Sequence, residues 1–391
     1  MPEAVAQAAP SFTEPSSPGD IGQSASTTTA IETTDISILY PLPLRGQSTA
    51  FVRPTTEGVH GQFLPETAFA QVVPRGALDE SQISNYASLA VIGLRLDPCY
   101  PKNGTSSGCK SEVRVVFQAV STDGSGDTSA ADGALHVTYA VPEFEIREML
   151  RAIQEARAKR TNPSNELGPH PILAAEGLGG SFALRLRAVM MERLGERRIS
   201  RITFYDHSVG PNGDQWTFGM VDHIGRTYTP VLVPTTSSLT QTVSGSQPHA
   251  LLEASFAQLV GQAPTKDPVT SLVGSQRPLP GTAEALALSK GFDAAVRVEN
   301  PTLHNADTTD CVNCHLAEGA HRVGSGTYGF KPDKAEGLGP VPARRDQRTS
   351  VSNLHAFGYL KREVSISQRT ANESMNVTKA FFGGGRGLGG P

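Results

Sequence analysis

Cysteine, tryptophan and long apolar runs are all scarce in this chain. Its 391 residues include four cysteines and one tryptophan. No apolar run approaches the ~20 residues that a membrane-spanning helix needs, and Met1-Pro2-Glu3-Ala4 does not begin a basic segment followed by an apolar one. The net charge of −4 gives no electrostatic argument for binding nucleic acid, so we expect no nucleic acid partner. The length favours a division into two domains.

One pentapeptide carries most of the functional information. Residues 311–315 read Cys-Val-Asn-Cys-His, the C-x-x-C-H pattern of covalent haem attachment. At this composition the pattern arises by chance about once in a thousand sequences of this length. On a helix, Cys311 and Cys314 lie on the same side and can each form a thioether to one haem vinyl group. His315 can then bind the iron as the proximal ligand, with Asp310 as a suitable N-cap.

Through Cys311, Cys314 and His315, residues 300–382 resemble a monohaem cytochrome c module. The resemblance implies one covalent haem c, a helix that begins at the motif, a loop that covers the ring edge and a later helix that crosses the first. Residues 322–350, rich in Gly, Pro, Arg and Lys, suit the loop. A helix is expected from about Gln368 to Phe382, with Ala371, Met375, Thr378 and Phe382 along one face.

Two other interpretations of the cysteine pair stay open. A redox-active disulfide between Cys311 and Cys314 needs a thioredoxin-like βαβ context, which does not surround the motif. A closed zinc site needs four ligands, and His304, His321 or His355 would have to assist.

The distal haem ligand has two leading candidates. His355 lies in a segment of irregular backbone, and Met375 lies where the family commonly supplies a methionine. His304 and His321 follow, and an open position is the alternative. His136 is interpreted as an ordinary residue of a strand, and Met375 could equally be a core residue.

Haem attachment in the resembled bacterial systems follows export, so we expect a periplasmic or cell-surface protein whose signal segment is not in the chain. Residues 1–34 are rich in Ala, Ser, Thr, Pro and Gly and predict a flexible tether, through which membrane attachment would be possible; a plain disordered tail is the alternative. Cys99 and Cys109 bracket a turn-rich stretch and can close a small disulfide loop, which would also indicate an oxidising compartment. Two free thiols are the alternative there.

The part before the motif predicts an α+β fold with an antiparallel sheet. The expected strands and helices alternate in groups along the chain. Strands are expected at residues 36–40, 89–96, 113–120, 134–141, 199–207, 215–221 and 227–233, and helices at 144–159, from Ser181 to about Gly195, 251–260 and 282–296. Residues 235–248 are polar and predict a boundary. The expected organisation is a tether (1–34), a strand-rich α+β domain (35–248) and a mostly helical haem-c module (249–391).

These observations predict an exported monohaem protein that transfers single electrons to an unidentified redox partner protein, or holds haem in a cell-surface assembly. An electron carrier is favoured over an enzyme, because iron redox cycling needs no catalytic acid or base. The alternative is a non-haem cell-surface structural or adhesive protein, in which Cys311 and Cys314 form a disulfide or a metal clip.

Overall fold

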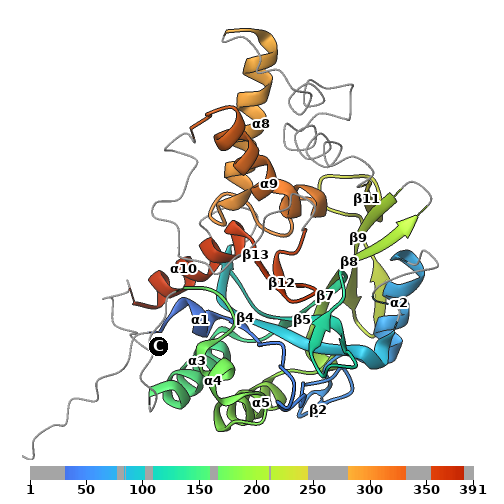
Figure 1. The fold of residues 1–391 in the computed structure, drawn as a ribbon, viewed down its shortest axis with the longest axis vertical. Coiled ribbons are helices and arrows are strands. Elements are labelled where there is room, and N and C mark those ends of the chain that lie inside the picture. The colour runs from blue at the N-terminus through green and yellow to red at the C-terminus, as the bar shows by residue number, and fades with distance from the viewer. Residues whose placement is uncertain are drawn as a thin grey trace, which may run out of the picture.

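An antiparallel sheet forms the centre of the molecule (Figure 1). The computed structural model describes residues 31–76, 83, 85–101, 109–158, 166–210, 213–244, 281–331 and 354–382. Within these residues the sheet has nine strands. In spatial order they are β1 (Ser37–Leu39), β4 (Leu89–Pro101), β5 (Cys109–Thr122), β7 (Ala134–Ala140), β8 (Ile199–Gly210), β9 (Gly213–Ile224) and β10 (Thr227–Pro230), with β6 (Thr128–Ala130) paired to β5 and β11 (Thr240–Ser244) paired to β9. The predicted α+β class is confirmed.

Helices and two short hairpins surround the sheet. The helices are α1 (Thr33–Ile36), α2 (Glu66–Gly76), α3 (Glu143–Ala158), α4 (Pro171–Glu176), α5 (Ser181–Arg193), α8 (Ala283–Glu299), α9 (Cys311–Thr327) and α10 (Gln368–Phe382). The hairpins are β2 (Glu57–Gly58) with β3 (Gly61–Gln62), and β12 (Phe357–Leu360) with β13 (Glu363–Ile366). Single 3-10 turns lie at Tyr86–Ser88 and Glu196–Arg198.

One face of the sheet is apolar and holds the main core. Because side chains alternate between the faces of a strand, every second residue of each strand points to this face. One fully buried cross-strand row on it consists of Leu94, Val115, Val137, Ile202 and Val221. Helices α2 and α3 contact these strands, and α5 packs on α3. This face therefore supplies stability, and its contacts are the usual ones of an α+β layer.

The opposite face is covered by the C-terminal elements. Hairpin β12–β13 is attached to β5 through Gln118, whose amide donates to the carbonyl of Tyr359 (2.9 Å) and accepts from its N–H (2.8 Å). A Cβ at Gly93 would lie 2.8 Å from the Phe357 ring, so this strand position of β4 needs glycine for the hairpin to approach. Helix α9 contacts β9 and β11, and α10 contacts β4 (Figure 1).

Contacts also link the two ends of the described chain. Ser37 and Ser374, from the two ends of the described chain, are hydrogen-bonded at 2.7 Å. Strand β11, inside the expected boundary segment, is part of the sheet. Residues 31–34, expected to belong to the tether, are buried, with Thr33 and Thr34 in α1. Residues 31–34 thus pack with the folded part of the chain, whereas position 248 lies outside the described residues and the division there stays a prediction.

Most predicted elements are present, with some corrections in detail. Every expected strand has a counterpart in the sheet, and the expected helices at 144–159, after Ser181, at 282–296 and at 368–382 correspond to α3, α5, α8 and α10. Gly180 occupies the N-cap of α5, and the helix begins at the expected Ser181. The expected helix at 251–260 and residues 332–350 of the expected cover loop lie outside the described residues. In the described part of the chain, no helix has the length and apolarity needed to cross a membrane.

Helix α10 has a buried side that is largely polar. Arg369, Asn372, Glu373 and Ser374 are all less than one tenth exposed, as is Ala371, whereas Met375 is only half-buried. The expected apolar stripe along α10 is therefore wrong in composition. The helix is held by hydrogen bonds and ion pairs as well as by apolar packing, which places charged groups inside the molecule.

We predict that the buried imidazole of His170 makes the fold sensitive to acid. His170 is fully buried before α4, stacks on Phe182 with ring centroids 4.7 Å apart, and has no hydrogen-bond partner for either ring nitrogen among the described residues. Burial, and to a lesser extent Arg157, lowers its pKa from 6.5 to about 3. As the pH falls from 6.5 toward 3, the unfolded chain binds a proton that the folded chain does not, so stability is lost.

This group should lower the free energy of unfolding by about 2 kcal/mol between pH 7.5 and pH 5. Urea unfolding of the wild type and of His170→Phe at both pH values measures the effect. The free energy of unfolding should fall by about 2 kcal/mol more in the wild type than in His170→Phe between the two pH values. Equal pH dependence in both would contradict the assignment.

Candidate functional site

The C-x-x-C-H motif forms the first turn and a half of α9, and this turn is fixed to the sheet. The Asp310 carboxylate caps the helix by accepting from the N–H of Asn313 (2.9 Å), as predicted from the sequence. Gln241 of β11 donates to the same carboxylate (3.0 Å) and accepts from the N–H of Val312 (3.2 Å). Burial raises the pKa of Asp310, whereas its hydrogen bonds oppose the rise. Gln241 thus links the edge strand β11 to the start of α9.

The tautomer of His315 follows from its partner. Its Nδ1 lies 2.5 Å from the backbone carbonyl of Leu354. Because a carbonyl can only accept, Nδ1 carries the proton and donates it, and the neutral ring therefore has its lone pair on Nε2. The rings of Tyr205 and Phe218 lie 5.8 and 5.0 Å from the imidazole. A metal-binding histidine is commonly oriented in this way, with the second nitrogen held by a carbonyl.

Cys311 and Cys314 line the same pocket as His315 and carry free thiols. Burial, followed by the neighbouring Cys314, raises the pKa of Cys311 to about 12. Burial also raises the pKa of Cys314. Both sulfurs are therefore neutral at pH 7. Redox-active cysteine pairs and zinc sites use thiolates, whose pKa is usually lowered, so this environment does not favour either of those uses.

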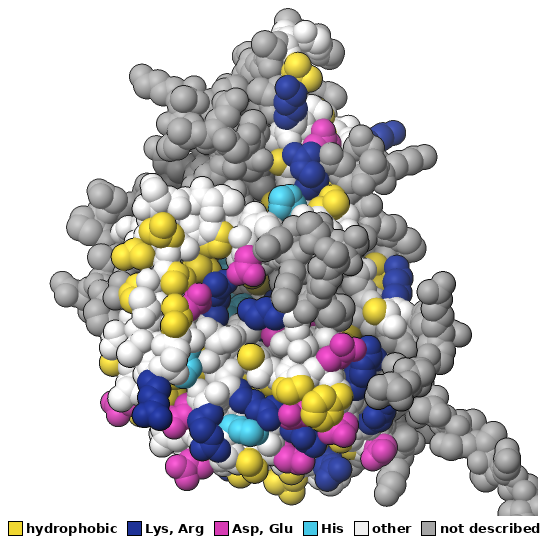
Figure 2. All heavy atoms as spheres, turned by 180° about the vertical axis from the view of Figure 1, so that it is seen from behind, with side chains coloured by type: hydrophobic (Ala, Val, Ile, Leu, Met, Phe, Trp, Pro, Cys, Tyr) yellow, Lys and Arg dark blue, Asp and Glu magenta, His cyan; other side chains and the backbone are white. Residues whose placement is uncertain are grey.

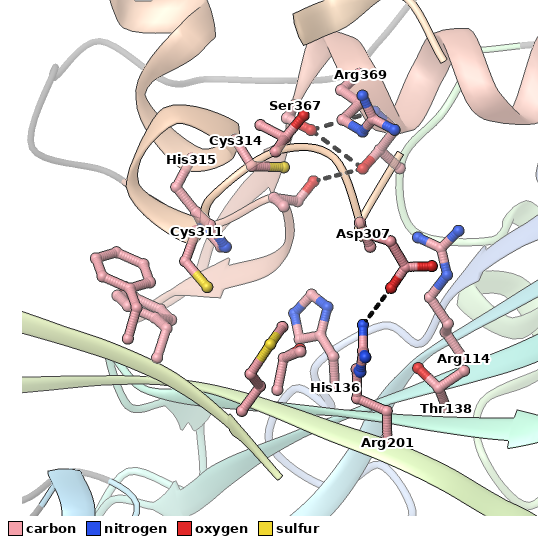
Figure 3. A pocket seen from close by; sticks show the side chains of 18 of the residues that line it. Arg114, His136, Thr138, Arg201, Asp307, Cys311, Cys314, His315, Ser367 and Arg369 are labelled. Carbon is pink, nitrogen blue, oxygen red and sulfur yellow. Dashed lines mark hydrogen bonds and ion pairs between the residues drawn. The ribbon is translucent and has the colours of Figure 1, made fainter. Parts of the chain in front are cut away.

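The second wall of the pocket is the polar face of the sheet. One cross-strand row on this face consists of Arg95, Arg114, Thr138, Arg201 and Asp222. We call it the arginine row. Its three arginines line the pocket. Arg201 binds Asp222 (2.5 Å) and also Asp307 (2.6 Å), which precedes α9, so this ion pair ties the motif to the sheet (Figure 3).

Glu373 of α10 lies among three arginines. Its carboxylate is paired with Arg95, with Arg114 (3.2 Å) and with Arg369 (3.0 Å). Burial opposes its ionisation, but the charges of Arg114, Arg95 and Arg369 hold its pKa far below the usual range. Arg114 also binds Glu112 (2.6 Å). The result is a buried charged cluster with a surplus of guanidinium groups beside the pocket.

The next row of the same face carries two residues that can bind a metal. It consists of Val116, His136, Thr203 and Met220, and His136 and Met220 both line the pocket. Figure 3 shows His136 rising from the sheet on the side of the pocket opposite Cys311, Cys314 and His315. Burial, followed by the charges of His315 and Arg95, lowers the pKa of His136 well below 6.5. Its ring is therefore neutral at pH 7.

The distal candidates chosen from the sequence lie elsewhere. His355 is buried and its Nε2 lies 2.8 Å from Asp132 Oδ1 and 3.1 Å from the Tyr205 hydroxyl. Burial would raise the pKa of Asp132, but the hydrogen bonds from His355 and Tyr205 keep it below the usual value. Neither His355 nor Met375 is among the described residues that line the pocket. His355 thus lies beside the motif, next to the Leu354 carbonyl that holds His315, but its ring is engaged by Asp132 and Tyr205 instead of lining the pocket.

The other two histidines considered are also absent from the described residues that line the pocket. His321 faces α8, where its Nδ1 lies 2.7 Å from Glu299. The backbone carbonyl of His304 accepts from Arg369. In the described part of the chain, no group of three or more His, Cys, Asp or Glu side chains is placed to hold a metal ion. The histidines proposed for a zinc site therefore do not assemble around Cys311 and Cys314.

The second cysteine pair lies at the far end of the β4–β5 hairpin. Cys99 belongs to β4, and Cys109 is paired in register with Pro101 of β4. The hairpin brings the two segments together, as the predicted small loop requires. The side chains of both cysteines lie outside the described structure, so the disulfide stays a prediction.

The donor set of the pocket fits a haem. Two thiols one helical turn apart, an imidazole with its lone pair on Nε2 and a neutral imidazole on the opposite wall match the attachment and ligation of a c-type haem. Phe218 and Met220 supply apolar contacts. The arginine row supplies cationic groups of the kind that bind carboxylates such as haem propionates.

Figure 2 shows one face of the molecule, with charged side chains of both signs. Basic and acidic side chains lie next to one another over the face drawn in Figure 2, without a broad area of one sign. This agrees with the net charge of −4. No protein-family model, curated protein or solved structure matches the chain.

We predict that Glu373 is essential for stability because it balances buried positive charge. Glu373→Gln should lower the free energy of unfolding by about 3–5 kcal/mol, since it leaves Arg95, Arg114 and Arg369 without their shared carboxylate. Glu363→Gln on β13, where the side chain is exposed, is the matched control and should change stability by less than about 0.5 kcal/mol. Urea unfolding of both variants makes the comparison; similar stability in the two would refute the role of the cluster.

Proposed function

We propose that the chain holds one covalently attached haem between α9 and the polar face of the sheet, and that it transfers single electrons. The observation that best supports this proposal is the orientation of His315. The Leu354 carbonyl accepts from Nδ1, and His315 lines the same pocket as the two cysteines of its helical turn. Cys311 and Cys314 would form the thioethers, and His315 would bind the iron. Bound haem supplies the Fe(III)/Fe(II) couple.

The protein's own contribution is position and environment. Gln241, Asp310 and the pair Arg201–Asp307 hold the start of α9 against the sheet. Tyr205 and Phe218 pack around the His315 ring and limit its contact with water. The guanidinium groups of the arginine row would interact with the haem propionates. Their positive charge would favour the reduced haem, and Glu112 and Glu373 would weaken this effect because they neutralise part of that charge. These features tune a potential and require no catalytic acid or base.

Location and partner follow from this chemistry as further parts of the proposal. Attachment of haem c after export would place the protein in the periplasm or at the cell surface, in agreement with the predicted Cys99–Cys109 disulfide. A redox partner protein would approach the exposed edge of the haem. The alternative of a structural protein with a metal clip is less well supported, because the histidines considered for that clip lie apart from the cysteines.

The test of attachment is production of the chain with an export signal, in a host that attaches haem c and that also loads a known cytochrome c. The purified protein should show a Soret band, and after denaturation its mass should exceed the polypeptide mass by one haem. The Cys311→Ser/Cys314→Ser protein should have the polypeptide mass. His321→Ala, on the same helix but facing α8, is the matched control and should be loaded like the wild type.

A colourless wild type with the polypeptide mass, in cells where the reference cytochrome is loaded, would end the proposal. Electron transfer is measured separately. A potentiometric titration of the loaded protein should be reversible and fit a one-electron step. If reduction were irreversible, the attachment of haem would still stand, but the role of the protein as an electron carrier would be contradicted.

A further inference from the structure

His136 occupies the wall of the pocket that faces the motif. Its strand, β7, is in the middle of the sheet, between β5 and β8. The register pairs His136 with Val116 on one side and Thr203 on the other, and Thr203 with Met220. On the same face, Tyr205 and Phe218 contact the ring of His315. The two histidines therefore approach one space from opposite sides, one from α9 and one from the sheet (Figure 3).

The imidazole of His136 is half-buried, lines the pocket and makes no hydrogen bond to another of the described residues. The other histidines around the motif differ: His315 is held by a carbonyl, His321 by Glu299 and His355 by Asp132. The nitrogens of His136 are therefore not engaged by another described residue, unlike those of the three rings just named. A ligand in the pocket would supply the missing partner.

We propose that His136 is the second axial ligand of the haem, on the face opposite His315. This assignment rests on the proposed function, because it requires the haem that Cys311 and Cys314 would attach. A neutral imidazole binds haem iron well, and a strand in the middle of the sheet holds the ligand rigidly. With both axial positions filled by the protein, iron would be shielded from small ligands and would act in electron transfer.

Met220 is the competing ligand, because it lies in the same row and lines the same pocket. The two side chains differ in what they need. A buried thioether packs among apolar groups without a penalty, whereas the polar ring of His136 makes no hydrogen bond within the described residues. Met220 is thus fully explained as an apolar wall, and His136 is not.

The experiment compares His136→Ala with Met220→Leu in the haem-loaded full chain. Wild type and Met220→Leu should give low-spin ferric spectra by electron paramagnetic resonance, and their reduced forms should not bind carbon monoxide. His136→Ala should keep the mass of one attached haem, lose the low-spin signal and bind carbon monoxide. Added imidazole should restore the low-spin signal.

A second variant covers the case in which His136→Ala fails to fold. His136→Met keeps a ligand of similar size, and it should stay six-coordinate with a midpoint potential raised relative to wild type. An unchanged low-spin spectrum in His136→Ala, or its loss in Met220→Leu, would overturn the assignment while leaving the attached haem in place. Absence of haem from the wild type would instead remove the proposed function and the ligand together.

Discussion

The alternation of side chains along the antiparallel strands is the constraint on which the site depends. The same strands that bury Leu94, Val115 and Val137 on one face place Arg95, Arg114 and His136 on the other. A shift of register by one residue would exchange the two faces and bury the charged groups among the helices. The apolar core therefore does more than stabilise the fold. The packing of the apolar core fixes the positions of the polar rows that form one wall of the pocket.

The other wall depends on polar contacts between distant parts of the sequence. Helix α9 meets the sheet through Gln241 and through the pair Arg201–Asp307, and His315 is oriented by the Leu354 carbonyl. Glu373 brings α10 to the arginines of the sheet. Buried charge is costly unless it is paired, and here nearly every such group has a partner. His136, half-buried on the pocket wall, makes no hydrogen bond within the described residues, and its position opposite His315 supports the ligand assignment.

Local features of the site could be predicted from the sequence, whereas its long-range partners could not. The C-x-x-C-H spacing and Asp310 identify the start of α9, because both are set within one helical turn. The apolar and β-branched segments between turn residues likewise predicted the strands of the antiparallel sheet. The sequence did not indicate that Leu354 would meet His315 or that His355 would pair with Asp132, since those contacts depend on tertiary packing. One available signal was missed: Arg114, His136 and Arg201 all point to the same face of interior strands, where charged and titratable residues are unusual and indicate a site.

The most direct test of this account is the position of iron in crystals of the haem-loaded protein. Anomalous diffraction at the iron absorption edge should give a single strong peak between His315 Nε2 and the polar face of the sheet, beside Cys311 and Cys314. Continuous density should join both sulfurs to the porphyrin. An iron peak elsewhere, a tetrahedral metal ion on the two cysteines or a disulfide between them would contradict the central claim.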